Sequence, residues 1–303
     1  MVTLSISNML ELNNLVKQYD GVKAVDSIKL KIKKGDIFGF LGPNGAGKTT
    51  TIRMIMGIIE PDSGDILLNQ RNIIEYGRDE LGYLPEDRGL YQKQKLEETV
   101  KYFANLRGLE DQQATVQINY WLERFDLIDQ KNRKIEELSK GNQQKIQFIL
   151  SLIHDPSLLI LDEPFTGLDP INQVLLKEII QEKSNEGKTI LFSTHQMEQV
   201  ERLCNNICLI NKGKIILNGK LEDIRKAYSR NHVKVRYTGD LDPEKTKLFF
   251  KNIKFNNSNF SGELSKPVRE IIQWLNQTVN LELFEMKSPT LEQIFIESIN
   301  KSV

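Results

Sequence analysis

The sequence has little cysteine and no excess of charge of either sign. Its 303 residues include only two cysteines, Cys204 and Cys208, and 41 basic side chains balance 41 acidic ones. The cysteine spacing fits one helix face or a junction between a helix and a strand, so we interpret both as reduced packing thiols rather than as a metal or redox pair. The balanced charge argues against a nucleic-acid partner, which usually requires a basic face.

Long apolar runs are also missing. No segment approaches the roughly 20 apolar residues that cross a bilayer as a helix. The amino terminus lacks a basic segment followed by an apolar core, which argues against a secretory signal. A protein of this composition can act at a membrane only through a partner. Met9 is an alternative translation start, which leaves open that residues 1–8 are an appendage.

Buried strands are the clearest structural signal. Residues 37–41, 158–161 and 189–193 are nearly continuous apolar runs, which is the pattern of strands that are covered on both faces of a parallel sheet. Between residues 28 and 32 apolar residues alternate with lysines, which predicts a strand with one wet face. The alternation of strands with helical segments predicts an α/β fold with a parallel core sheet.

The pattern changes after a predicted helix at 220–228. We predict a first domain of residues 1–227, which contains a helical insert at about 88–150, and a small α+β accessory domain of residues 228–303. In the second domain the sequence predicts strands at 232–237 and 281–286, a loop rich in Asn and Ser at 256–262, and an amphipathic helix at 289–299.

The strongest chemical motif is the segment 42–49, which satisfies G-x-x-x-x-G-K-[ST] between a buried strand and a helix. Glycines let successive backbone N–H groups point at phosphate oxygens, and the helix N-terminus adds its dipole. We predict that Lys48 lies between the β- and γ-phosphates and acts in catalysis, and that the Thr49 hydroxyl is a Mg²⁺ ligand. The predicted ATP-binding residues here are Gly42, Pro43, Asn44, Gly45, Ala46, Gly47, Lys48, Thr49 and Thr50.

A pair of carboxylates ends the apolar run at 158–161. An unpaired carboxylate near a core is costly, so stability alone does not account for Asp162 and Glu163. We predict that Asp162 lies in the outer coordination sphere of Mg²⁺ and that Glu163 polarises the attacking water as a general base.

These motifs together resemble the ATP-binding cassette of ABC transporters, over about residues 10–226. The resemblance implies the ABC type of P-loop NTPase fold, with an antiparallel β part near the amino terminus and a helical insert. It also implies ATPase activity with ATP and Mg²⁺. Residues 138–142 are similar to the family's signature motif, which contacts the γ-phosphate held by the opposite subunit. Ser139 and Gly141 match this motif, whereas Lys140 and Asn142 depart from it.

The resemblance assigns further residues. Asp169, in the segment 167–170, is expected to connect the two sites of a dimer, and His195 is expected to touch the γ-phosphate and orient Glu163. Tyr19 stands where the family stacks an aromatic ring on adenine. Glu86 stands where the family usually has a glutamine, and an ionised Glu cannot donate a hydrogen bond, although it can approach Mg²⁺ or its water.

The same resemblance implies partners. We expect a head-to-tail dimer with a second ATPase subunit, identical or not, and transmembrane permease subunits encoded separately that meet the chain near residues 87–91. The protein would then be cytoplasmic and peripheral on the inner face of the cell membrane. Residues 288–295 resemble the end of small C-terminal domains in a bacterial group of exporters. Two alternatives stay open, which are a soluble ABC-family ATPase of translation or DNA repair and a nucleotide-binding regulator without turnover.

Overall fold

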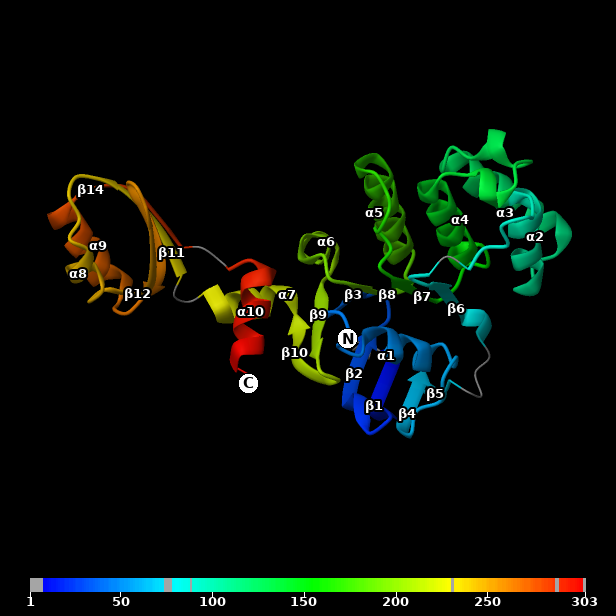
Figure 1. The fold of residues 1–303 in the computed structure, drawn as a ribbon, viewed down its shortest axis with the longest axis horizontal. Helices are drawn as coiled ribbons and strands as arrows, with labels where there is room; N and C mark the ends of the chain where they lie inside the picture. Colours follow the sequence, from blue (N-terminus) through cyan, green and yellow to red (C-terminus); the bar gives the residue numbers. More distant parts are fainter. Residues whose placement is uncertain (1–7, 74–77, 88, 230–231, 287–288, 302–303) are drawn as a thin grey trace, which may run out of the picture. The chain divides into compact units, whose positions relative to one another are not determined.

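The computed structural model describes residues 8–73, 78–87, 89–229, 232–286 and 289–301 (Figure 1). Residues 1–7 of the proposed appendage, Arg88, and Ser288 of the C-terminal motif lie outside these ranges. The chain divides into two compact units, residues 1–218 and 219–303. Among the described residues, no helix combines the length and the apolar composition that crossing a membrane requires.

The first unit is built on a six-stranded sheet with the strand order β10-β9-β3-β8-β7-β6. Strands β9, β3, β8, β7 and β6 pair in parallel, and every residue of β3, β7 and β8 is buried, as the apolar runs predicted. The strands are β3 (Ile37–Leu41), β6 (Leu81–Leu84), β7 (Leu158–Asp162), β8 (Thr189–Thr194), β9 (Asn206–Asn211) and β10 (Lys214–Lys220).

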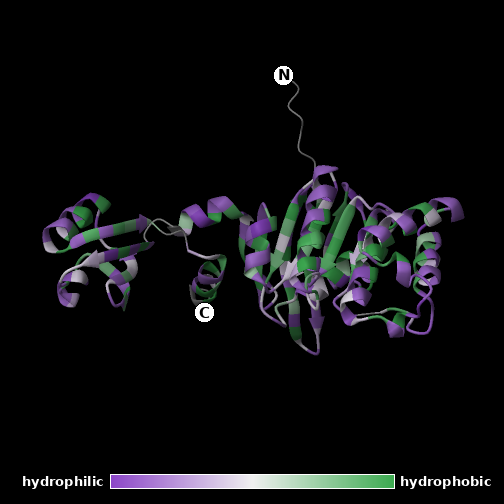
Figure 2. Cartoon of the chain, turned by 90° about the horizontal axis from the view of Figure 1, so that it is seen from above, coloured by the Kyte–Doolittle hydropathy of each residue, from purple (hydrophilic) through white to green (hydrophobic). Residues whose placement is uncertain are grey.

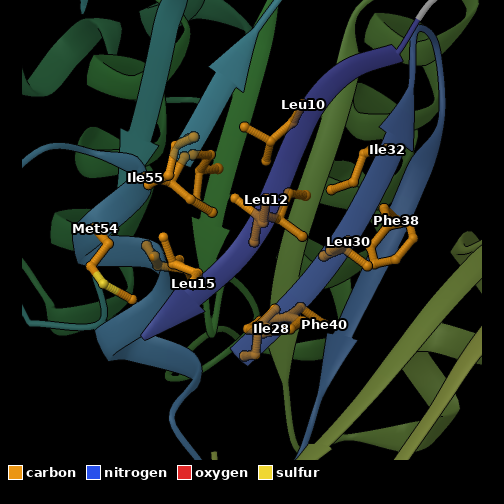
Figure 3. Close-up of a cluster of buried hydrophobic side chains, with 14 of the residues drawn as sticks. Leu10, Leu12, Leu15, Ile28, Leu30, Ile32, Phe38, Phe40, Met54 and Ile55 are labelled. Carbon is orange, nitrogen blue, oxygen red and sulfur yellow. The ribbon is translucent and has the colours of Figure 1, made fainter. Parts of the chain in front are cut away.

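A second sheet of the first unit has the order β2-β1-β4-β5 and antiparallel pairing. Its strands are β1 (Asn8–Tyr19), β2 (Val22–Lys33), β4 (Ser63–Leu68) and β5 (Arg71–Asn72). In β2 the side chains of Ile28, Leu30 and Ile32 are buried and the lysines between them are exposed, which confirms the predicted wet face. Side chains of both sheets and of helix α1 (Lys48–Ile55) form one apolar cluster (Figure 3).

Helices of the first unit cover the parallel sheet, and its strands are the most apolar part of the unit (Figure 2). Between β6 and β7 the chain forms the predicted helical segments. Helix α5 follows β7, and helix α6 follows β8. The bounds are α2 (Leu96–Leu106), α3 (Asp111–Arg124), α4 (Lys140–Leu152), α5 (Pro170–Asn185) and α6 (Met197–Leu203), with 3₁₀ turns η1 (Arg78–Glu80), η2 (Ile128–Gln130) and η3 (Ile135–Glu137).

The second unit contains a four-stranded antiparallel sheet with the order β12-β13-β11-β14. Two helices lie between its strands in the chain, which gives the β-α-β-β-α-β succession of a ferredoxin-like fold. Its core includes Val235, Phe260 and Ile271. The elements are α7 (Leu221–Ser229), β11 (His232–Thr238), α8 (Pro243–Thr246), β12 (Phe250–Asn256), β13 (Asn259–Leu264), α9 (Val268–Thr278), β14 (Asn280–Met286) and α10 (Leu291–Lys301).

The prediction of a loop over residues 256–262 is wrong. Only Asn257 and Ser258 form a turn there, and β13 begins at Asn259. Asn257 has a φ of 50°, a left-handed conformation that Asn tolerates in tight hairpin turns. The polar residues of β13 lie on the solvent side and alternate with buried Phe260, so a true strand has the composition of a loop.

Candidate functional site

The glycine-rich loop lies between β3 and α1, and its backbone packs closely against the backbone near Ile210 and Ala24. A Cβ atom added to Gly42 would lie 2.4 Å from the carbonyl oxygen of Ile210, and one added to Gly47 would lie 2.4 Å from that of Ala24. Gly47 also has a φ of 106°, which L side chains rarely adopt. Neither position accepts a side chain without moving the loop, so these glycines fix the path of its backbone.

Lys48 is the first residue of α1, and its side chain folds back over the loop. Its Nζ donates hydrogen bonds to the carbonyl oxygens of Gly42 at 2.8 Å and Pro43 at 3.2 Å. Burial lowers the pKa of Lys48, and the carboxylates of Glu163, Asp162 and Glu86 act in the opposite direction. The ammonium is therefore a buried cation that faces a group of acids, with room for phosphate between them.

A cavity of about 360 Å³ opens beside this lysine. It brings together the loop, the start of α1, the segment after β6 and the end of β7, which lie far apart in the sequence. The residues that line it are Ala24, Asn44, Gly45, Gly47, Lys48, Thr49, Thr50, Glu86, Asp162 and Glu163. Nine of the residues that the sequence predicted for ATP, Mg²⁺ or catalysis therefore share one cavity, namely Asn44, Gly45, Gly47, Lys48, Thr49, Thr50, Glu86, Asp162 and Glu163.

Asp162 ends β7 and is almost fully buried, with 1% of its surface exposed. The Ser193 hydroxyl donates to its Oδ1, whereas no described residue donates to its buried Oδ2. Burial raises the pKa of Asp162, and Glu163 raises it further, while the hydrogen bond from Ser193, the charge of Lys48 and the nearby Thr49 hydroxyl lower it. An oxygen without a partner beside a hydroxyl is a suitable environment for a hydrated Mg²⁺ ion. The described part of the chain holds no cluster of three His, Cys, Asp or Glu side chains arranged for a metal.

Glu163 follows directly and its carboxylate is held from one side by the end of β8. Thr194 Oγ1 donates to Oε2 at 3.0 Å, and the backbone N–H of His195 donates to Oε1 at 3.0 Å. The Nδ1 atom of His195 lies 2.7 Å from the same Oε1. Glu163 has a φ of 49°, which is unusual for a residue with a side chain. The fold thus aims this carboxylate at the cavity in one fixed orientation, as general-base catalysis requires.

Two residues that the sequence analysis missed support these acids. Parallel pairing places Ser193 beside Asp162, and Thr194 follows at the end of the same strand. The signal for them was present, because this polar pair interrupts the apolar run of β8 just before His195. Only the strand register, however, shows which acid each hydroxyl contacts.

Ser139 and Gly141 lie at the start of α4, outside the residues that line the cavity. Ser139 is the N-cap, and its Oγ accepts a hydrogen bond from the Asn142 backbone N–H at 3.2 Å. A Cβ atom on Gly141 would meet nothing nearer than the Gly167 carbonyl oxygen at 3.6 Å, an ordinary contact distance. The N-terminal end of α4 is thus accessible to a ligand from outside this chain.

Asp169 and Tyr19 also lie outside the cavity lining. Asp169 caps α5, and hydrogen bonds from the Asn172 backbone and side chain lower the pKa of its carboxyl. Tyr19 ends β1 with 46% of its surface exposed, and Lys17 Nζ lies 5.7 Å from its ring centroid. The Tyr19 ring is therefore accessible for stacking.

The first unit carries a phosphate loop after a buried strand, an acidic pair on a neighbouring strand and a cavity between them. These features define a P-loop nucleoside triphosphatase. The ABC transporter family matches residues 25–166, and the family described as "ATP-binding protein DrrA1-3-like, C-terminal domain" matches residues 219–299.

Several similar proteins point to one family. The chain is 42% identical over 293 residues to the uncharacterized ABC transporter ATP-binding protein YhaQ of Bacillus subtilis, with 96% of this chain and 98% of YhaQ covered. It is 39% identical to the ABC transporter ATP-binding protein NatA of Bacillus subtilis, over 67% of this chain and 84% of NatA. It is 36% identical to the Nod factor export ATP-binding protein I of Cupriavidus metallidurans, over 78% of each chain. The chain belongs to the ATP-binding proteins of ABC transporters, and its activity is that of an ABC transporter ATPase.

Solved structures agree on the fold. A structure described as the ATP-binding subunit of an ABC transporter is similar with a TM-score of 0.69 and 31% identity, over 73% of this chain and 93% of that one. A dimeric ATP-binding cassette in a post-hydrolysis state, bound to ADP and Pi, has a TM-score of 0.65 at 22% identity and covers 70% of this chain. These comparisons confirm the predicted cassette with its parallel core sheet.

Proposed function

We propose that the chain binds Mg·ATP, forms a head-to-tail dimer around two nucleotides, and uses ATP-driven closure of that dimer to power export through separate transmembrane subunits. It would work at the inner face of the cell membrane, with residues 1–227 as the engine and residues 228–303 as an accessory domain. The name of one relative supports export, because the Nod factor protein is named as an export protein.

The observation that carries this proposal is the orientation of the Glu163 carboxylate. His195 and Thr194 hold it at the cavity that contains Lys48. In this arrangement Glu163 accepts a proton from the attacking water, and Lys48 stabilises the negative charge of the transferred phosphate. His195 contacts the γ-phosphate with the imidazole edge that does not face Glu163.

Thr49, Asp162 and Glu86 would surround Mg²⁺. The Thr49 hydroxyl and the unpartnered Oδ2 of Asp162 are oxygen atoms of the kind that Mg²⁺ and its water molecules prefer. The bound ion would neutralise charge on the β- and γ-phosphates. Thr49 would hold the ion directly, whereas Asp162, already hydrogen-bonded to Ser193, would orient a water molecule of the ion.

The dimer completes the site. Ser139 and Gly141 present a hydroxyl, backbone N–H groups and a helix N-terminus, which is a set of donors for an anion, on the accessible end of α4. They lie outside the cavity of their own chain. A second chain that is turned head to tail would bring its α4 to this cavity, so each nucleotide would lie between a phosphate loop and a partner's signature motif.

A mixing experiment tests this arrangement. Lys48→Ala disables the phosphate loop, and Ser139→Asp places a negative charge against the γ-phosphate while keeping a good N-cap. Each variant alone should be inactive. Because half of the dimers in an equal mixture are mixed and each has one complete site, the mixture should recover about a quarter of the normal ATPase rate.

The matched control is a mixture of Lys48→Ala with Glu163→Gln. Both changes affect the half of the site that one chain contributes, so no combination restores a complete site and this mixture should stay inactive. The shared site would be excluded if the Lys48→Ala and Ser139→Asp mixture also remained inactive although the chains exchange. It would also be excluded if the control mixture recovered activity.

A further inference from the structure

One face of α4 lies along β6 and the segment that follows it. Three residues contact β6 or the segment after it, and they are spaced three or four positions apart, as residues on one helix face are. Two of them lie in α4 and the third lies just after its C-terminal end. Gln147 Nε2 donates to the carbonyl oxygen of Asp87 at 3.2 Å, and His154 Nε2 donates to that of Leu81 at 3.0 Å. Between them, a Cβ atom on Gly82 would lie 2.1 Å from the Ser151 carbonyl oxygen. We refer to Gln147, Ser151 and His154 with Leu81, Gly82 and Asp87 as the α4–β6 seam.

The two segments of the seam run antiparallel. Residues 147, 151 and 154 of the helix and its C-terminal end contact residues 87, 82 and 81 of β6 and the following segment, so the residue numbers rise on one side as they fall on the other. Positions that are four and three residues apart share one helix face. The bare Gly82 lets the backbones meet at the centre, and a side-chain hydrogen bond holds each end. Close packing of this kind couples the positions of the two segments.

The two ends of this body matter for the reaction. Ser139 and Gly141 lie at the N-terminus of α4, and Glu86 lies at the end of the seam beside Asp87. Glu86 lines the nucleotide cavity with Lys48 and Asp162. Glu86 therefore shares this cavity with the carboxylates of Asp162 and Glu163. Like charges repel, so a contact that fixes the backbone of this segment favours the position of Glu86 at the cavity.

Gln147 is the side chain that holds that backbone. It is 5% exposed, its Nε2 donates to the Asp87 carbonyl oxygen, and no described residue donates to its Oε1. A buried amide with an unsatisfied oxygen is costly, so packing alone does not explain it. We propose that Gln147 is a positioning residue of the ATPase reaction, which holds Glu86 at the nucleotide cavity and ties its position to that of α4.

This inference rests on the proposed function, because it takes Glu86 as a group that faces Mg·ATP. Its consequence is a cis connection between the two halves of the shared site. When the nucleotide held by a partner chain binds Ser139 and shifts α4, the contact between Gln147 and Asp87 shifts Glu86 of the same chain. The Glu86 carboxylate then moves relative to Lys48 without any change in the phosphate loop itself.

The test measures binding of a fluorescent ATP analogue to the full chain as Mg²⁺ is titrated. Gln147→Met keeps the length of the side chain but removes the donor, and Gln147→Glu, which also lacks the donor when ionised, is the second variant. We expect either change to raise the Mg²⁺ concentration at half-saturation by about tenfold, as loss of an outer-sphere support does. Binding in EDTA should stay unchanged, because the phosphate loop is intact.

Two comparisons separate positioning from general destabilisation. In a Glu86→Ala background Gln147→Met should shift the Mg²⁺ midpoint by less than about twofold, because the group it positions is gone. Ser151→Ala removes a buried hydrogen bond on the same helix face, from Ser151 Oγ to Phe148, without touching the Glu86 segment. It should leave the midpoint unchanged at a comparable thermal unfolding temperature.

An equal shift with and without Glu86, or no shift in either Gln147 variant, would overturn the inference. Failure of the proposed function would look different. In that case the unmodified chain would bind the analogue without any dependence on Mg²⁺, or would not bind it.

Discussion

Replacing Glu163 by Gln should lower the ATP turnover rate by about 10²–10⁴-fold and leave ATP binding intact. The amide oxygen of Gln can still accept hydrogen bonds from Thr194 Oγ1 and the His195 backbone N–H, so the geometry of the site is kept. What is lost is a group that can take the proton of the attacking water. In the proposed cycle ATP binding closes the dimer and hydrolysis opens it, so the variant should accumulate as an ATP-bound dimer.

Steady-state phosphate release and size-exclusion chromatography with and without ATP measure the two effects. Glu178→Gln is a matched control, because Glu178 is exposed on α5 and is not among the residues that line the cavity. It should hydrolyse ATP at the normal rate. A Glu163→Gln protein that turns over normally would remove Glu163 from the role of general base. The regulator without turnover, the alternative left open by the sequence, predicts no phosphate release from the unmodified chain.

Replacing Lys48 by Ala should weaken ATP binding by about 10–100-fold, which is the loss expected for a charge-assisted hydrogen bond to phosphate. The change removes the cation that offsets Asp162, Glu163 and Glu86, so the cavity becomes repulsive to phosphate. It also leaves the carbonyl oxygens of Gly42 and Pro43 without their donor. Equilibrium binding of a fluorescent ATP analogue measures the effect, and Lys29→Ala, at an exposed site on β2, is the control.

The pH dependence of binding provides a second readout of Lys48. Burial lowers the pKa of this ammonium from its ordinary value, so its charge is lost at a less alkaline pH than that of an exposed lysine. ATP affinity of the unmodified chain should therefore fall as the pH rises through that lowered value. The Lys48→Ala protein should not show this fall. A similar fall in both proteins would assign the pH dependence to another group.

The elements that could be predicted from sequence are those whose signal is local. The apolar runs at β3, β7 and β8 are continuous because these strands are covered on both faces. The segment 42–49 carries its own chemistry in its spacing, so the cavity could be predicted before its shape was known. Cys204 and Cys208 are buried thiols at the junction of α6 and β9, as their spacing indicated.

Features that depend on register or on contacts between distant segments could not be predicted. The hydroxyl of Ser193 reaches Asp162 only because β7 and β8 pair in one particular register. The bond from Gln147 to Asp87 joins residues that are sixty positions apart. β13 has the composition of a loop because polar residues alternate with the residues of its buried face, where Phe260 is the large apolar side chain. Helix α9 was not predicted, although its sequence carries a helical pattern. Ile271 and Leu275 are four residues apart, which places them on one helix face, and both are fully buried.

The left-handed backbone of Glu163 has a consequence for the stability of this strand end. A residue with a side chain in this conformation costs about 1–2 kcal/mol relative to glycine, which adopts it freely. Glycine here would relieve that strain, but it would also leave the Thr194 hydroxyl and the His195 backbone N–H without their acceptor. The hydrogen bonds that orient the carboxylate therefore also offset the strain of the backbone that carries it.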